Sequence, residues 1–120
     1  MPTYISLIHY TEQGIRAIQD SPGRLEAGKR LLKDLGGELK AFYLTMGPYD
    51  IVIVLEAPND EVVAKFALAL SAQGNVRTTH LRAFSEAEYR KIVKELPPGT
   101  SRGGSKPGGT AARGPQTGRS

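Results

Sequence analysis

Hydrophobic positions in the first 96 residues follow two spacings, one typical of strands and the other typical of helices. Four segments rich in β-branched and aromatic residues lie between turn residues, and they predict strands over 3–10, 39–46, 51–55 and 76–84. The stretches between them place apolar residues three or four positions apart, which indicates amphipathic helices. The second and third strands are joined by a short Gly-Pro-containing link, which predicts an antiparallel hairpin.

Capping residues support these helices. Ser21 can cap the first long helix and Pro22 suits its first turn, and a shorter helical stretch precedes them. Asn59 caps the second long helix, and a capping box from Ser85 to Glu88 opens a last one. The order is β-α-β-β-α-β plus a C-terminal helix, so we predict the α+β fold class with the ferredoxin-like arrangement. In that arrangement the first and third strands are central, and the two long helices cover one face of the sheet.

The two central strands are apolar on both faces. The third strand, Ile51–Leu55, contains five aliphatic residues without a polar one, and the first strand has Ile5 and Leu7 on one side with Tyr4 and Ile8 on the other. Strands that are buried on both sides have this continuous pattern. The last helix is one candidate cover for the second face and another copy of the sheet is the other, so we expect a homodimer. The same third strand lacks the basic and aromatic residues with which RNA-recognition motifs stack bases.

The charge of the chain is concentrated in its last segment. Residues 97–120 hold four of the sixteen basic residues and no acid, which leaves twelve basic and twelve acidic residues in 1–96. This tail has no aromatic or large aliphatic residue, so we predict one domain over 1–96 and a disordered, Gly/Pro/Ser/Arg-rich basic tail over 97–120. A solubilising role for the tail is favoured, and nucleic acid is an unlikely partner except through weak contact with it.

Four stretches of the sequence resemble the GYD domain family of small bacterial and archaeal proteins: MPTYISLIHYTEQGIR, LGGELKAFYLTMGPYD, FALALSAQGNVRTTHLRAF and EYRKI. The resemblance covers about residues 1–95, and the signature falls on Gly47, Tyr49 and Asp50. It implies a ferredoxin-like, dimeric α/β-barrel fold and no established activity. A looser similarity is to the ligand-binding domains of leucine-responsive-type regulators, which have a related turn near an amino-acid effector site.

The turn between the second and third strands is the first candidate site. Gly47, Tyr49 and Asp50 either form a plain hairpin turn, with the aspartate bonded to a nearby amide, or place a hydroxyl and a carboxylate at the mouth of a pocket. Tyr43 on the second strand is a further candidate for lining that pocket. With His9, these residues are the predicted ligand-binding set, and we expect the pocket between sheet and helices.

The two histidines, His9 and His80, are the candidate catalytic residues, because an imidazole titrates near neutral pH. Their strands are neighbours in a ferredoxin-like sheet, so the two side chains could be close together. Structural roles for both are the more ordinary interpretation. No HxH or HExxH spacing is present, and we expect no metal and no cofactor.

These observations favour a homodimeric small-molecule-binding module whose partners are itself and a small organic ligand. One alternative is a cofactor-independent oxygenase or isomerase of the dimeric α/β-barrel class, with a histidine as base. A second is a non-catalytic interaction or assembly protein. The chain has no cysteine and no apolar run long enough to span a membrane, so we expect a cytoplasmic protein that does not associate with membranes.

Overall fold

A computed structural model describes residues 1–99, in which Met1–Ser85 form one compact unit and a second unit begins at Glu86. In chain order the elements are β1 (Thr3–Tyr10), α1 (Glu12–Arg16), the 3-10 helix η1 (Ile18–Asp20), α2 (Ser21–Asp34), β2 (Glu38–Leu44), β3 (Ile51–Glu56), α3 (Asp60–Ala72), β4 (Val76–Ala83) and α4 (Glu86–Lys94). The predicted strands and long helices are therefore present. The predicted tail lies outside the described residues from position 100 onward.

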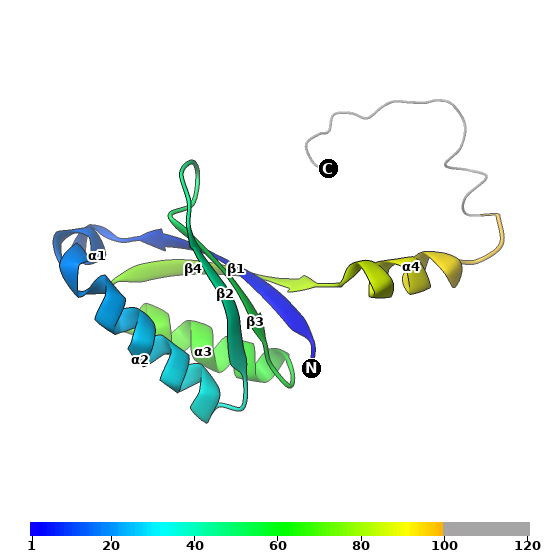
Figure 1. The fold of residues 1–120 in the computed structure, drawn as a ribbon, viewed down its shortest axis with the longest axis horizontal. Helices are drawn as coiled ribbons and strands as arrows, with labels where there is room; N and C mark the ends of the chain where they lie inside the picture. Colours follow the sequence, from blue (N-terminus) through cyan, green and yellow to red (C-terminus); the bar gives the residue numbers. More distant parts are fainter. Residues whose placement is uncertain (100–120) are drawn as a thin grey trace. The chain divides into compact units, whose positions relative to one another are not determined.

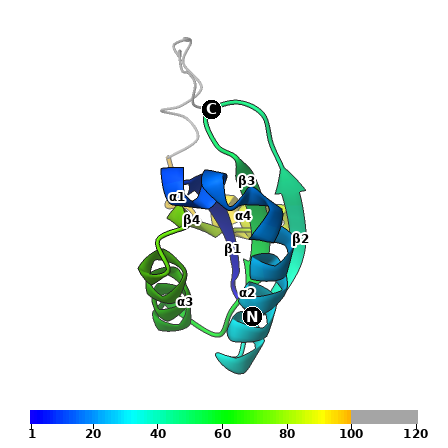
Figure 2. The ribbon, with the colours of Figure 1, turned by 90° about the vertical axis from the view of Figure 1, so that its left-hand side faces the viewer.

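The four strands form one sheet in the order β2-β3-β1-β4, with every neighbouring pair antiparallel. Strands β1 and β3 are central, and α2 and α3 lie side by side against one face of the sheet (Figure 1, Figure 2). This confirms the α+β, ferredoxin-like prediction. A register shift between Leu39 and Ala41 breaks the pairing of β2 with β3, and the sequence pattern did not indicate it.

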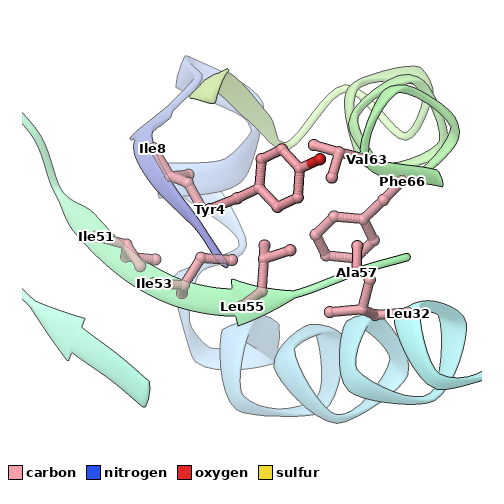
Figure 3. Close-up of a cluster of buried hydrophobic side chains, with 9 residues drawn as sticks. All are labelled: Tyr4, Ile8, Leu32, Ile51, Ile53, Leu55, Ala57, Val63 and Phe66. Carbon is pink, nitrogen blue, oxygen red and sulfur yellow. The ribbon is translucent and has the colours of Figure 1, made fainter. Parts of the chain in front are cut away.

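The hydrophobic core lies between the sheet and its two helices. Side chains from β1 and β3 point toward residues of α2 and α3 (Figure 3). The most completely buried of them are Leu32 of α2, Leu55 of β3 and Phe66 of α3, with 0%, 0% and 1% of their surface exposed. Burial of such side chains contributes about 1.5–3 kcal/mol each, so this layer supplies much of the stability of the domain.

Burial alternates along both central strands. On β3, Ile51, Ile53 and Leu55 are buried while Val52 and Val54 are half-buried, and β1 alternates in the same way. The half-buried set faces away from α2 and α3, because successive side chains of a strand point to opposite faces. We call this second surface the open face; its apolar members on the central strands are Ile5, Leu7, Val52 and Val54.

One end of the helix-covered side is closed by contacts between two turns. Thr11 caps α1, and its backbone N–H donates to the carbonyl of Asn75 at 3.0 Å while its hydroxyl donates to the carbonyl of Gly74 at 2.6 Å. Gly14 is buried against the same turn, and a Cβ on it would overlap the carbonyl oxygen of Asn75. The close approach therefore requires glycine at position 14.

Helix α4 belongs to the second unit and is strongly amphipathic. Its apolar residues, together with Leu96 just beyond its end, are exposed: Tyr89, Ile92, Val93 and Leu96 have 44–60% of their surface accessible. Among residues 1–99, no helix has the length and apolar character needed to cross a membrane.

Candidate functional site

The hairpin loop between β2 and β3 carries the Gly-Tyr-Asp signature. It projects beyond the sheet, away from α2 and α3 (Figure 1, Figure 2). The backbone N–H of Thr45 donates to the carbonyl of Asp50 at 2.8 Å, and the Thr45 hydroxyl donates to the carbonyl of Tyr49 at 2.6 Å. Gly47 has φ of 124°, a conformation that residues with a Cβ rarely adopt. The loop is thus a defined turn with glycine at the position that needs it.

Asp50 fastens this loop to the central strand β1. Its backbone N–H donates to the carbonyl of Ile8 at 2.9 Å, and its carboxylate accepts the backbone N–H of Tyr10 at 2.8 Å. The aspartate therefore bonds a backbone amide, as the turn interpretation has it, but that amide is forty positions away on another strand. At least one carboxylate oxygen of Asp50 is committed to holding the sheet together.

His9 and Tyr49 stack on the open face. Their ring centroids are 4.7 Å apart with an interplanar angle of 37°. His9 alternates with Ile8 and Tyr10, whose side chains face the helices, so its imidazole is on the other side of the sheet. Tyr43 is opposite Val52 in the register and 60% exposed, which puts it on the open face as well.

The five residues predicted to bind a ligand, Gly47, Tyr49, Asp50, Tyr43 and His9, thus gather around the hairpin and the open face. The expected location between sheet and helices is wrong for them, since none lines the cavity found there. Both faces of the central strands are apolar, so the sequence pattern does not indicate which face the helices cover. The face on which the hairpin residues lie therefore could not be predicted. Their assignment to ligand binding stays a prediction.

His80 lies on the helix-covered side, opposite Ser6 of β1. Its Nδ1 is 2.5 Å from the hydroxyl of the fully buried Ser6, and its Nε2 is 3.0 Å from the hydroxyl of Thr78. Burial lowers the pKa of His80 below its ordinary value, so the ring is neutral at pH 7. Strands β1 and β4 are neighbours as predicted, but His9 and His80 are on opposite faces of the sheet, so the two side chains are not close together.

A cavity of about 80 Å³ lies between the sheet, α2 and α3, at the end closed by the turns of Thr11 and Asn75. Its inner wall is apolar and comes mainly from Ile8, Ile51, Ile53, Phe66 and Leu70. Its outer wall is polar and comes from Tyr10, Ser21, Arg24, Gln73 and Asn75. The Tyr10 and Ser21 hydroxyls are 3.1 Å apart. This combination of an apolar interior and a few convergent polar groups is typical of small-molecule sites.

Arg24 is the charged residue of this cavity. Its guanidinium donates to the carbonyl of Ala17 at 2.9 Å and to that of Gly14 at 3.3 Å, across the end of α1. No ion pair joins it to a carboxylate within residues 1–99. The spacing of apolar residues in α2 gave no sign that Arg24 reaches back to the end of α1, so sequence reasoning missed it.

Within the described part of the chain, no three His, Cys, Asp or Glu side chains are grouped so as to hold a metal ion. The cavity lining, over the same residues, includes neither a carboxylate nor an imidazole. The polar groups that line the cavity are hydroxyls, amides and the Arg24 guanidinium, which can form hydrogen bonds and recognise negative charge.

The chain is similar in sequence to known proteins. The GYD domain family matches residues 4–93. A relative from Thermus thermophilus named glutamine synthetase and cystathionine beta-lyase binding protein is 37% identical over 95 residues, which cover 78% of this chain and 100% of the relative. A crystal structure of a Thermus thermophilus protein is 27% identical with a TM-score of 0.42, and it covers 71% of this chain and 95% of that one. Since the family match spans both long helices and all four strands, the chain belongs to the GYD domain family.

Proposed function

We propose that this protein is a cytoplasmic binding module that works as a homodimer joined through the open face. The observation that carries the proposal is the pair of central strands with apolar side chains on both faces, of which α2 and α3 cover one. Full burial of an exposed aliphatic side chain contributes about 1.5–3 kcal/mol, and the half-buried side chains of the open face forgo part of this, which a second copy recovers for both chains. A binding role is also supported by the name of the Thermus thermophilus relative.

The distribution of charge on the open face suits a second copy. Arg77, at the β4 edge, is opposite His9 near one end of the sheet. Glu38 and Glu56 are directly opposite each other near the other end, toward the β2 edge. Like charges in such register destabilise a sheet, and Lys40, 3.8 Å from Glu38, offsets part of the repulsion. A cation from a partner would offset the rest.

Arg77 of the second copy supplies that cation if the two sheets pack face to face with their strands nearly perpendicular. Arg77 and the Glu38–Glu56 pair lie at diagonally opposite corners of the open face. A two-fold axis along the other diagonal places the Arg77 corner of each copy over the glutamate corner of its partner. The two corners on the axis then meet their own copies. Each exposes a large hydrophobic side chain: Tyr43 is 60% exposed at one corner and Leu81 is 45% exposed at the other. An isologous interface needs this self-complementarity.

The test compares two matched substitutions by sedimentation velocity over micromolar concentrations. Leu7→Glu puts a carboxylate in the centre of the open face, and we expect a folded monomer. Leu68→Glu makes the same change on α3, where Leu68 is 72% exposed, and we expect the dimer to persist. Reversal of charge sharpens the test: Arg77→Glu should weaken the dimer and the double variant with Glu56→Arg should restore it. A wild-type chain that sediments as a monomer overturns the proposal.

The hairpin set falls within the same surface. We propose that Gly47, Tyr49, Asp50, Tyr43 and His9 shape the interface around the hairpin corner, so that a small organic ligand bound there would be shared by two copies. In this proposal the protein still binds a small molecule, and ligand binding is coupled to dimerisation. Ligand-induced tightening of the dimer, measured with amino acids and aromatic acids, tests this role, and unchanged dimer affinity with every compound counts against it.

Recognition of other proteins is a second candidate function, favoured by the relative named for binding glutamine synthetase and cystathionine beta-lyase. Purified forms of these two enzymes are the probes, and co-sedimentation with the wild-type dimer is the measurement. An oxygenase or isomerase function is less well supported, because the described cavity lining offers no carboxylate or imidazole as a base.

A further inference from the structure

We infer that the cavity between the sheet, α2 and α3 binds a short aliphatic carboxylic acid, with Arg24 as the partner of its carboxylate. This site lies on the opposite side of the sheet from the proposed dimer interface. The two proposals are therefore independent, and each has its own measurement.

The size and lining of the cavity specify the apolar part of the ligand. Its volume of about 80 Å³ is several times the roughly 10–15 Å³ that one water needs and about half of the roughly 150 Å³ of an apolar cavity that holds benzene. Side chains of β1, β3 and α3 converge on its inner wall, with Ile8, Ile53 and Phe66 drawn in Figure 3. All three are at least 94% buried, and because they are hydrocarbon side chains they offer water no polar partner. A branched chain of a few carbons fits this space.

The outer wall specifies the head group. A guanidinium has five N–H donors, and two nitrogens of Arg24 each use one on the carbonyls of Ala17 and Gly14. The remaining donors belong to a full positive charge that is half-buried and has no carboxylate partner among residues 1–99. The Tyr10 and Ser21 hydroxyls, 3.1 Å apart, provide further hydrogen-bonding groups beside it. A carboxylate matches the planar fork of an arginine better than any neutral group does.

The two carbonyl contacts also give Arg24 a structural role at the end of α1. Such contacts fix the guanidinium before a ligand arrives, which reduces the entropy lost on binding. The experiment must therefore separate loss of charge from loss of the α1 contact. Arg24→Gln removes the charge and keeps an amide donor for a carbonyl. Arg30→Gln, on the exposed side of α2, is the matched control.

Gly28 offers an independent way to fill the cavity. It lines the cavity, and a Cβ on it would meet only the Leu70 Cδ2 atom, at the ordinary distance of 3.8 Å. Gly28→Leu therefore fills the apolar space while the guanidinium of Arg24 is retained. Because glycine is a poor helix former, the substitution in α2 also favours the helix.

The measurement is an amide chemical-shift titration of the full chain with 3-methylbutanoate, with 3-methylbutanamide as the neutral probe of equal shape. We expect saturable shifts at Tyr10, Arg24 and Asn75 with the acid, and roughly tenfold weaker or undetectable binding of the amide. Arg24→Gln should weaken acid binding by a similar factor, Arg30→Gln should leave it unchanged, and Gly28→Leu should abolish it. Absence of saturable shifts in the wild type, or equal binding of acid and amide, overturns the inference.

Discussion

The two faces of the sheet are built from alternate residues of the same strands, and they differ in what covers them. On the helix-covered face, Ile53 and Leu55 are 3% and 0% exposed. On the open face, their chain neighbours Val52 and Val54 are half-buried, and Leu81 is 45% exposed. Similar aliphatic residues thus reach full burial on one face through contacts within residues 1–85. The open face leaves apolar surface in contact with water, and burial of that surface would favour dimerisation.

A matched pair of substitutions tests this contrast and has the largest expected effect. Leu55→Ala removes a fully buried side chain beside α2 and α3, so we expect the free energy of unfolding to fall by about 2–5 kcal/mol at any protein concentration. Leu7→Ala makes the same change on the open face, where the lost contacts would be those of the proposed interface. Its cost should therefore grow with protein concentration, because dimerisation stabilises the folded chain by mass action.

Urea unfolding at two protein concentrations at least tenfold apart separates the two outcomes. If both variants lose stability by amounts that do not depend on concentration, then the open face is not an interface, and the contrast between the faces has no consequence in solution.

The turn contacts at the end of the helix-covered face provide the next test. Gly14→Ala places a methyl group against the carbonyl of Asn75, and such overpacking should cost about 1–3 kcal/mol of unfolding free energy. Gly28→Ala is the control within α2, where the nearest atom would be 3.8 Å away, and it should be neutral or raise stability by up to about 1 kcal/mol. Thermal unfolding of both variants gives the comparison. Equal stability of the two would show that the turns can separate at little cost.

Asp50 links the hairpin to β1, and its replacement should have a smaller effect. Asp50→Ala leaves the Tyr10 N–H without its 2.8 Å acceptor, which should cost about 1–2 kcal/mol of unfolding free energy. Asp50→Asn retains a carbonyl oxygen in the same place and should cost less. Amide hydrogen exchange at Tyr10 reports the contact directly. Unchanged protection of that amide in Asp50→Ala would mean that the carboxylate has another role.

The sequence was sufficient to predict the fold because the fold follows from local patterns. The continuous apolar run Ile51–Leu55 indicated two apolar faces, and Ser21 and Asn59 marked the two helix starts. The side chain of Asn59 caps α3 as predicted. At the start of α2 the N-cap is Asp20 and no side-chain cap bond occurs, so the capping role predicted for Ser21 is wrong. Short-range rules govern turns, caps and periodicity, so elements and their order can be read without knowing their tertiary contacts.

The site was less predictable because it depends on contacts between distant segments. Asp50 meets the Tyr10 amide across forty positions, and Arg24 reaches the carbonyls of α1 only because the chain turns back at Ala17. The pattern also could not assign His9 and His80 to faces, since that requires the strand register. Residue types identified the candidates, while the register decided which of them lie together.

The weakest expected effect concerns the polar contact inside the helix-covered face. Burial lowers the pKa of His80 from its ordinary value of 6.5, so the folded chain resists a proton that the unfolded chain accepts. Above pH 6.5 both states are neutral and the histidine contributes nothing to the pH dependence. As the pH falls from 6.5 toward the lowered pKa, the free energy of unfolding should fall, and below that pKa the loss should level off.

His80→Gln can still bond Ser6 and Thr78 but does not titrate, so its unfolding free energy should fall less steeply than that of the wild type over this range. Parallel slopes for the wild type and His80→Gln in urea unfolding would contradict the prediction and would mean that the imidazole reaches solvent freely, as a residue of the open face would.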